Sequence, residues 1–117
     1  MTQEDKALLL KDLSCRIPYG VIVNVNGVFD SKLTSVSWYD EVSVEDSVGL
    51  YNISEVKPYL FPLLSMTEEQ QTNLTKFVAN GITGENILYD WYNKNHFDYR
   101  GLIKKGLAID ATGLNIY

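Results

Sequence analysis

The chain has 117 residues and a formal net charge of −5, and 45% of its residues are apolar. This length predicts a single domain over residues 1–117, and eight Tyr, four Phe and two Trp are too many aromatic residues for a disordered chain. A lone Cys15 excludes an internal disulfide, and a lone His96 excludes a multi-histidine metal site. No apolar run is long enough to cross a membrane, and the polar start at residues 1–6 differs from a secretory signal, so we expect neither membrane insertion nor secretion.

Charge is unevenly distributed along the chain. Residues 40–70 contain seven acidic residues and one lysine, whereas residues 94–117 contain four basic and two acidic residues. Two interpretations remain open: two separately solvated surfaces, or an acidic region that meets a basic one across a homodimer. The acidic balance argues against sequence-independent nucleic-acid binding, which needs a basic field to displace counterions from phosphates.

The first predicted element is a helix over residues 3–15. Thr2 and Asp5 have the spacing of a capping box, and Pro18 and Gly20 end the helix. One side of this helix is apolar (Ala7, Leu8, Leu9, Leu10, Leu13), and the other carries Lys6, Lys11 and Asp12.

Three strands follow over residues 20–27, 32–39 and 42–50, where apolar residues repeat with the two-residue period of a sheet face. They are Val21, Val23 and Val25 in the first strand, Val36 and Trp38 in the second, and Val42, Val44, Val48 and Leu50 in the third. Asn26-Gly27 is a candidate hairpin turn, and Asp30-Ser31 is an equally good one. Asp46 breaks the alternation of the third strand, which indicates a bend there or a further turn at Asp46-Ser47. The short connections exclude parallel crossovers, so we expect a three-stranded antiparallel meander.

Two or three helices and an irregular tail complete the predicted α+β fold. Residues 54–58 are predicted to form one helical turn, and residues 59–64 to be extended. Ser65/Glu68 and Thr67/Gln70 both have capping-box spacing before a helix that ends at Asn80-Gly81, with Leu74, Phe77 and Val78 as its buried face. Thr83 is predicted to cap a last helix over 84–95, with Ile87, Leu88, Trp91 and Tyr92 on its apolar side. Part of the tail from His96 to Tyr117 is expected to add an edge strand.

The densest polar and aromatic stretch is His96-Phe-Asp-Tyr-Arg-Gly-Leu102. In one interpretation, His96, Asp98, Tyr99 and Arg100 bind an anion or perform acid–base chemistry. In the other, Arg100 pairs with an acid, and Phe97 and Tyr99 cover the edge of the core. Cys15 is interpreted as a buried or incidental thiol, because the only histidine is far away in sequence.

Aromatic residues supply the remaining candidates for a binding surface, because rings are enriched at interface hot spots as well as in cores. These candidates are Trp38, Tyr59, Trp91 and Tyr92. The phosphate-binding glycine loops and the nucleophile-elbow motif are absent from the sequence. We therefore predict no cofactor, no metal and no catalytic residue.

Several stretches also resemble one group of small proteins found in gut Bacteroidales genomes and their phages or mobile elements. The similar stretches are Asp5–Leu13, Pro18–Val21, Lys57–Leu60, Ser65–Glu69 and His96–Ile103. The resemblance implies a bacterial cytoplasm and an accessory role, and it implies no activity, cofactor or catalytic residue.

Three functions follow from these observations. The first is a non-enzymatic or regulatory module that binds a protein partner, or a second copy, through aromatic residues and the acidic middle of the chain. The alternative is a small-molecule or nucleotide-binding accessory protein, for example an anti-defence factor. Its pocket would lie between sheet and helices, with Arg100 and His96 meeting an anionic group. An enzyme that uses His96 and Asp98 is the third hypothesis.

Overall fold

The computed structural model describes residues 1–37, 39–80 and 85–117. Helix α1 (Gln3–Arg16) is followed by strands β1 (Ile22–Val25), β2 (Phe29–Val36), β3 (Glu41–Val44), β4 (Tyr51–Asn52) and β5 (Val56–Pro62). Helices α2 (Glu68–Asn80) and α3 (Glu85–Lys94) come next, and two short strands, β6 (Phe97–Asp98) and β7 (Ile109–Asp110), lie in the tail. Short 3-10 helices occupy Ile17–Tyr19, Ile53–Glu55 and Leu63–Ser65. The predicted α+β class with an N-terminal helix is confirmed.

The strands form one mixed sheet in the order β4-β3-β2-β1-β5-β6, and β7 also pairs with β5. β1, β2 and β3 are antiparallel neighbours in chain order, so the predicted meander agrees with this part of the sheet. The third strand is shorter than expected, because β3 ends at Val44 and Val48 and Leu50 lie exposed beyond it. β5 extends the sheet by pairing antiparallel with β1 and parallel with β6 and β7.

The hairpin between β1 and β2 turns at Asn26 and Gly27. Both residues have positive φ angles, 54° and 70°, in the left-handed region that asparagine and glycine tolerate best. The alternative turn, Asp30-Ser31, lies inside β2 instead.

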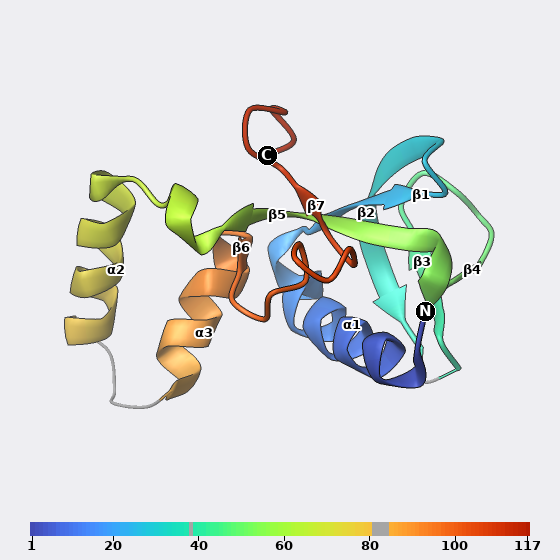
Figure 1. The fold of residues 1–117 in the computed structure, drawn as a ribbon, viewed down its shortest axis with the longest axis horizontal. Coiled ribbons are helices and arrows are strands. Elements are labelled where there is room, and N and C mark those ends of the chain that lie inside the picture. The colour runs from blue at the N-terminus through green and yellow to red at the C-terminus, as the bar shows by residue number, and fades with distance from the viewer. Residues whose placement is uncertain (38, 81–84) are drawn as a thin grey trace.

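Helix α1 lies against the sheet and closes the core, as Figure 1 shows. Leu9 and Leu13 of α1 are fully buried with alternate residues of β1, which are Val23 and Val25. Asp12 was expected on the polar side of this helix, yet it is also fully buried, because Arg16 one turn later neutralises it. Thr2 caps the helix as predicted by accepting a hydrogen bond from the Asp5 amide at 3.0 Å.

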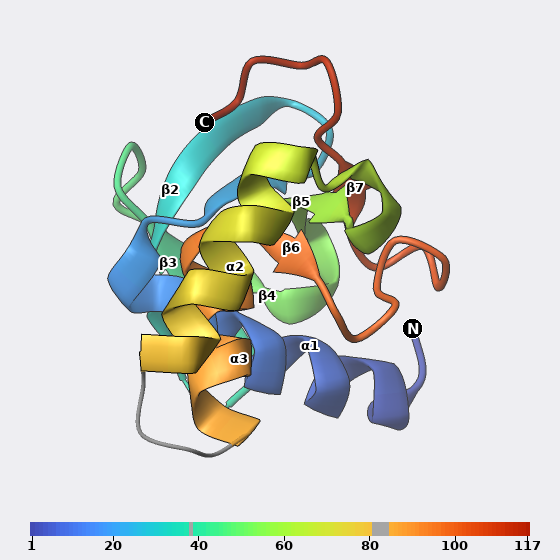
Figure 2. The ribbon, with the colours of Figure 1, turned by 90° about the vertical axis from the view of Figure 1, so that its left-hand side faces the viewer.

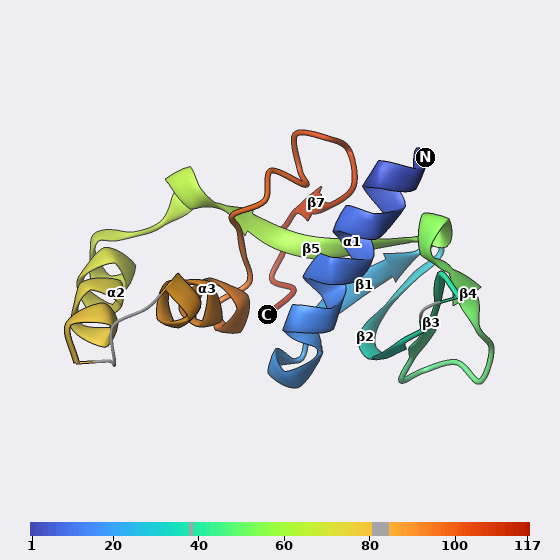
Figure 3. The same cartoon turned by 90° about the horizontal axis from the view of Figure 1, so that it is seen from below.

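Helices α2 and α3 extend from one end of the sheet. Figure 1 places α3 between α1 and α2, and Figure 2 views the molecule from the α2 end. Phe77 and Val78 of α2 were predicted to be buried but are 40% and 45% exposed. The reason is that α2 lies at the end of the molecule, where it packs on α3 and lies away from the sheet (Figure 3). Thr67 and Gln70 cap α2 reciprocally, as predicted, with N–O distances of 2.9 and 3.1 Å. The predicted cap Thr83 lies outside the described residues.

Candidate functional site

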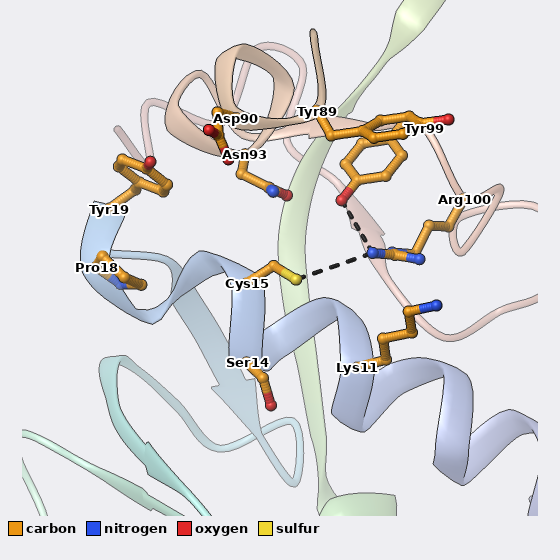
Figure 4. Close-up of a pocket in the computed structure, with 10 residues that line it drawn as sticks. All are labelled: Lys11, Ser14, Cys15, Pro18, Tyr19, Tyr89, Asp90, Asn93, Tyr99 and Arg100. Carbon is orange, nitrogen blue, oxygen red and sulfur yellow. Dashed lines mark hydrogen bonds between the residues drawn. The ribbon is translucent and has the colours of Figure 1, made fainter. Parts of the chain in front are cut away.

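A cavity of about 730 Å³ lies between α1 and α3, and the first residues after β6 form part of its wall (Figure 4). Small-molecule sites in proteins commonly have volumes of roughly 300–1,000 Å³. Helix α1 and the turn after it contribute Lys11, Ser14, Cys15, Pro18 and Tyr19; α3 contributes Tyr89, Asp90 and Asn93; and the tail contributes Tyr99 and Arg100.

One buried carboxylate organises the cations beside this cavity. Arg16 and Asp12 are fully buried and form a two-point ion pair, with N–O distances of 2.8 and 3.1 Å. The Nε of Arg100 reaches the same carboxylate at 3.1 Å. Two guanidinium groups therefore share one carboxylate, which leaves this side of the cavity with a net positive charge.

Stacked rings hold the side chain of Arg100 in place. The ring of Tyr99 stacks on Tyr89 and Tyr92, with centroid distances of 5.0 and 5.6 Å. The Cζ atom of Arg100 lies 4.8 Å from the Tyr99 centroid, and its Nη2 donates to the Tyr99 hydroxyl at 3.0 Å. Cation–π contact and hydrogen bonding together pre-organise this guanidinium at the cavity wall. Among the described residues its hydrogen bonds use Nε and Nη2, so Nη1 remains for a ligand.

Asn93 presents a buried polar group to the cavity. The residue is 3% exposed, and its Oδ1 has no hydrogen-bond partner among the described residues. Figure 4 shows its amide extending from α3 toward α1. A buried acceptor without a donor costs about 1–3 kcal/mol, so a ligand that donates an N–H or O–H here would recover stability.

Cys15 supplies a thiol on the opposite wall. The sequence indicated a buried or an incidental thiol. Burial is wrong, because the residue is exposed on the side of α1 that faces the cavity. Its Sγ lies 3.9 Å from the Nη2 of Arg100 (Figure 4).

Of the residues singled out in the sequence, the structure brings Tyr99 and Arg100 to the cavity. Arg100 pairs with an acid, as one interpretation expected. His96 lies elsewhere: its ring stacks on Tyr117 with a centroid distance of 3.6 Å. Burial, with a smaller contribution from the charge of Arg16, lowers the pKa of His96 to about 4, so its ring is neutral at pH 7.

The other candidates have mainly structural surroundings. The two carboxylate oxygens of Asp98 accept from the amides of Leu102 and Ile103, each at 2.9 Å. The following candidates lie in packed positions: Trp91 stacks on Phe97, Tyr92 stacks on Tyr99, and Tyr59 is buried and donates to Asp30. Trp38 lies outside the described residues.

Sequence reasoning missed the two helical faces that line the cavity. Lys11, Ser14 and Cys15 follow the three- and four-residue spacing of one face of α1, and Tyr89 and Asn93 do the same on α3. This spacing was visible in the sequence, but nothing in it showed that the two faces oppose each other.

Two further observations concern the described residues only. No helix within them has the length and apolar character needed to span a membrane. No group of three or more His, Cys, Asp or Glu side chains within them is placed to hold a metal ion.

Comparison with protein-family models gives no match, and comparisons with curated proteins and with solved structures give none either. A function for the chain therefore has to be inferred from the geometry of the cavity.

Proposed function

We propose that the protein binds a small anionic molecule in the cavity between α1 and α3. The observation that carries this proposal is the combination of a pre-organised Arg100 with a buried, unpartnered Asn93 oxygen on the same cavity. A carboxylate or phosphate suits the guanidinium, and a donor on the same molecule suits Asn93. This is a modified form of the small-molecule-binding alternative from the sequence. The cavity lies between two helices instead of between sheet and helices, and Asn93 and Lys11 rather than His96 line it with Arg100.

The charges that line the cavity also favour an anion. Among the described residues that line the cavity, Lys11 and Arg100 are opposed by one carboxylate, that of Asp90. Because the carboxylate of Asp12 is already paired with Arg16, it cannot neutralise the charge of Arg100 completely. A chain with an overall charge of −5 thus has a locally positive cavity, and such a site attracts anions against the general field of the protein.

Thermal-shift measurements with paired fragments test the proposal. Each carboxylate or phosphate in the set is matched with its neutral amide or alcohol, and both are added to the full chain. We expect the anions to raise the melting temperature more than their neutral partners. The double variant Lys11→Gln/Arg100→Gln should lose this difference, because it removes both cations from the cavity.

A matched control is Lys104→Gln/Lys105→Gln, which changes the net charge equally at exposed positions outside the cavity. This variant should keep the preference for anions. A preference that is absent from the original chain, or that falls equally in both variants, would show that the cavity does not bind anions.

Self-association is a second candidate function, and the exposed apolar residues of α2 favour it. Phe77 and Val78 are exposed on α2, and Leu64, just before it, is fully exposed. The first turn of α2 is acidic and the last turn of α3 is basic, so a second copy related by a twofold axis could pair these charges. This agrees with the homodimer suggested by the charge distribution in the sequence.

We propose that the protein is located in the bacterial cytoplasm and has an accessory role there. Both proposals follow from its resemblance to small proteins of Bacteroidales genomes and their phages or mobile elements. The exposed, unpaired Cys15 supports a reducing compartment.

A further inference from the structure

We propose that Cys15 forms a reversible mixed disulfide with a small anionic disulfide that enters the cavity. The inference rests on the proposed anion-binding function and names the chemical class of one ligand. Cys15 is exposed to the cavity, and its sulfur lies 3.9 Å from the Arg100 guanidinium. A disulfide that carries carboxylates would be attracted by Arg100 and Lys11 to the position where the thiol can attack it.

Asn93 is the independent observation that points to a ligand at this thiol. Its side chain is almost fully buried, lacks a partner for Oδ1 among the described residues, and lies across the cavity from Cys15 (Figure 4). A disulfide built from short acidic peptides carries amide N–H groups that can donate to this oxygen. The three groups therefore match three parts of one molecule: its carboxylates, its amide and its sulfur.

The reaction is thiol–disulfide exchange. Cys15 loses its proton to solvent, and its sulfur attacks one sulfur of the disulfide. The bond between the ligand's two sulfurs breaks as the new bond forms, so the Cys15 sulfur is oxidised. The departing half is reduced to a thiolate, which takes a proton from solvent. Arg100 lies beside the sulfur that carries negative charge during the attack.

The fate of the adduct follows from the cysteine count. The chain contains no second cysteine, so the mixed disulfide cannot resolve into an internal bond. It persists until an external thiol reverses the exchange. Modification at Cys15 thus fills the cavity reversibly, according to the redox state of the surroundings.

Rates of adduct formation test the inference. The reduced full chain is mixed either with oxidised glutathione, which is anionic and contains amides, or with the neutral bis(2-hydroxyethyl) disulfide. Intact mass spectrometry follows the adduct, and the same chain unfolded in urea gives the intrinsic ratio of the two rates. We expect folding to raise the preference for oxidised glutathione about tenfold. An unchanged ratio, or no adduct on the folded chain, would overturn the proposal.

Variants identify the source of the preference. Lys11→Gln/Arg100→Gln should return the ratio to its unfolded value, whereas Lys104→Gln/Lys105→Gln should keep it. Asn93→Ala should slow oxidised glutathione more than the neutral disulfide, which has hydroxyl groups but no amide N–H. If the cavity variant fails to fold, added salt provides the second test on the unmodified chain. Screening should then reduce the preference, and a salt-independent preference would contradict the role of the cations.

A separate measurement distinguishes this inference from the proposed function. Cys15→Ser cannot form the adduct, but it retains Lys11, Asn93 and Arg100. If anionic fragments stabilise Cys15→Ser while the unmodified chain shows no disulfide preference, the inference fails and the anion site stands. If the fragments do not stabilise Cys15→Ser either, both fail.

Discussion

Asp12 is the residue on which the cations beside the cavity depend. It is fully buried, and it contacts the equally buried Arg16 and the partly exposed Arg100. Arg16 also donates to the carbonyl oxygen of Phe97 at 2.7 Å, which ties α1 to β6. Removing the charge of Asp12 would leave one guanidinium buried without a counter-charge, and such losses are large in proteins.

We expect Asp12→Asn to lower the free energy of unfolding by about 3 kcal/mol, because Arg16 stays charged inside the core. Arg100→Gln should cost about 1 kcal/mol or less, since its charge is partly exposed and the Asp12–Arg16 pair remains intact. Urea denaturation followed by circular dichroism measures both values. Equal, small losses would mean that the carboxylate is hydrated in solution and does not hold the two arginines together.

The same residues show the limit of prediction from sequence at this scale. Local signals succeeded: Thr2 and Thr67 cap their helices, and Asn26-Gly27 forms the turn. Asp12 was assigned to the polar side of its helix, with Lys6 and Lys11, because charged residues usually lie opposite the apolar stripe. The partners that bury this pair come from Phe97 and Arg100, more than 80 residues later in the chain, and no local pattern indicates them.

At the scale of elements, the helices and strands that the sequence predicted are those whose apolar residues repeat with a clear helical or strand period. α1 and the strands β1 and β2 were expected near their observed positions. The two-residue strands β6 and β7 are too short to show alternation, and their parallel pairing with β5 joins distant segments. Arg100 and Tyr99 could be selected as candidates from residue type alone, but the opposing helix faces required this tertiary arrangement.

One aromatic pair in the tail adds to the contacts that β6 and β7 make with β5. Tyr117 stacks on His96, accepts from the Ile22 amide of β1 at 3.0 Å, and donates to the Tyr59 carbonyl of β5 at 2.8 Å. Burial raises the pKa of Tyr117 to about 12, so its hydroxyl remains protonated and able to donate. His96 itself has a φ of 63°, which asparagine or glycine could also adopt.

This pair predicts a loss of stability in acid. The pKa of His96 is lowered to about 4 by burial and then by Arg16, whereas an unfolded histidine titrates near 6.5. Between these values the unfolded chain binds the proton and the folded chain does not, so stability is complete above the unfolded pKa and falls as pH drops toward 4. After allowance for partial exposure, we expect His96 to account for about 2 kcal/mol of this loss.

The variant His96→Asn isolates this contribution, because asparagine tolerates the positive φ but does not titrate in this range. Urea unfolding at pH 7 and pH 4.5 should show a smaller acid-induced loss in the variant than in the original chain. Carboxylates elsewhere contribute equally to both proteins and cancel in the difference. An identical pH dependence in the two proteins would show that His96 is accessible to protons in the folded state.

At the scale of the whole molecule, the sheet with α1 forms the core, and α2 lies at one end of a body that measures 42 × 29 × 25 Å (Figure 1). Among the residues that the structure describes, none in the buried apolar cluster belongs to α2. A helix with little buried apolar surface opens locally at lower free energy than the core does. In an isolated molecule, α2 should therefore be among the first elements to exchange its amide hydrogens.

Hydrogen–deuterium exchange as a function of protein concentration tests both this expectation and self-association. In dilute solution, amides of α2 should exchange faster than those of β1, because Val23 and Val25 are buried and their strand is paired on both sides. If a second copy covers Phe77 and Val78, protection of α2 should rise with concentration while that of β1 stays constant.

The variant Phe77→Ser/Val78→Ser should abolish this rise in protection, and the control Leu114→Ser, at another exposed apolar position, should retain it. Protection of α2 that is low at every concentration would exclude self-association through this helix. Protection that matches β1 even in dilute solution would show that α2 unfolds together with the core.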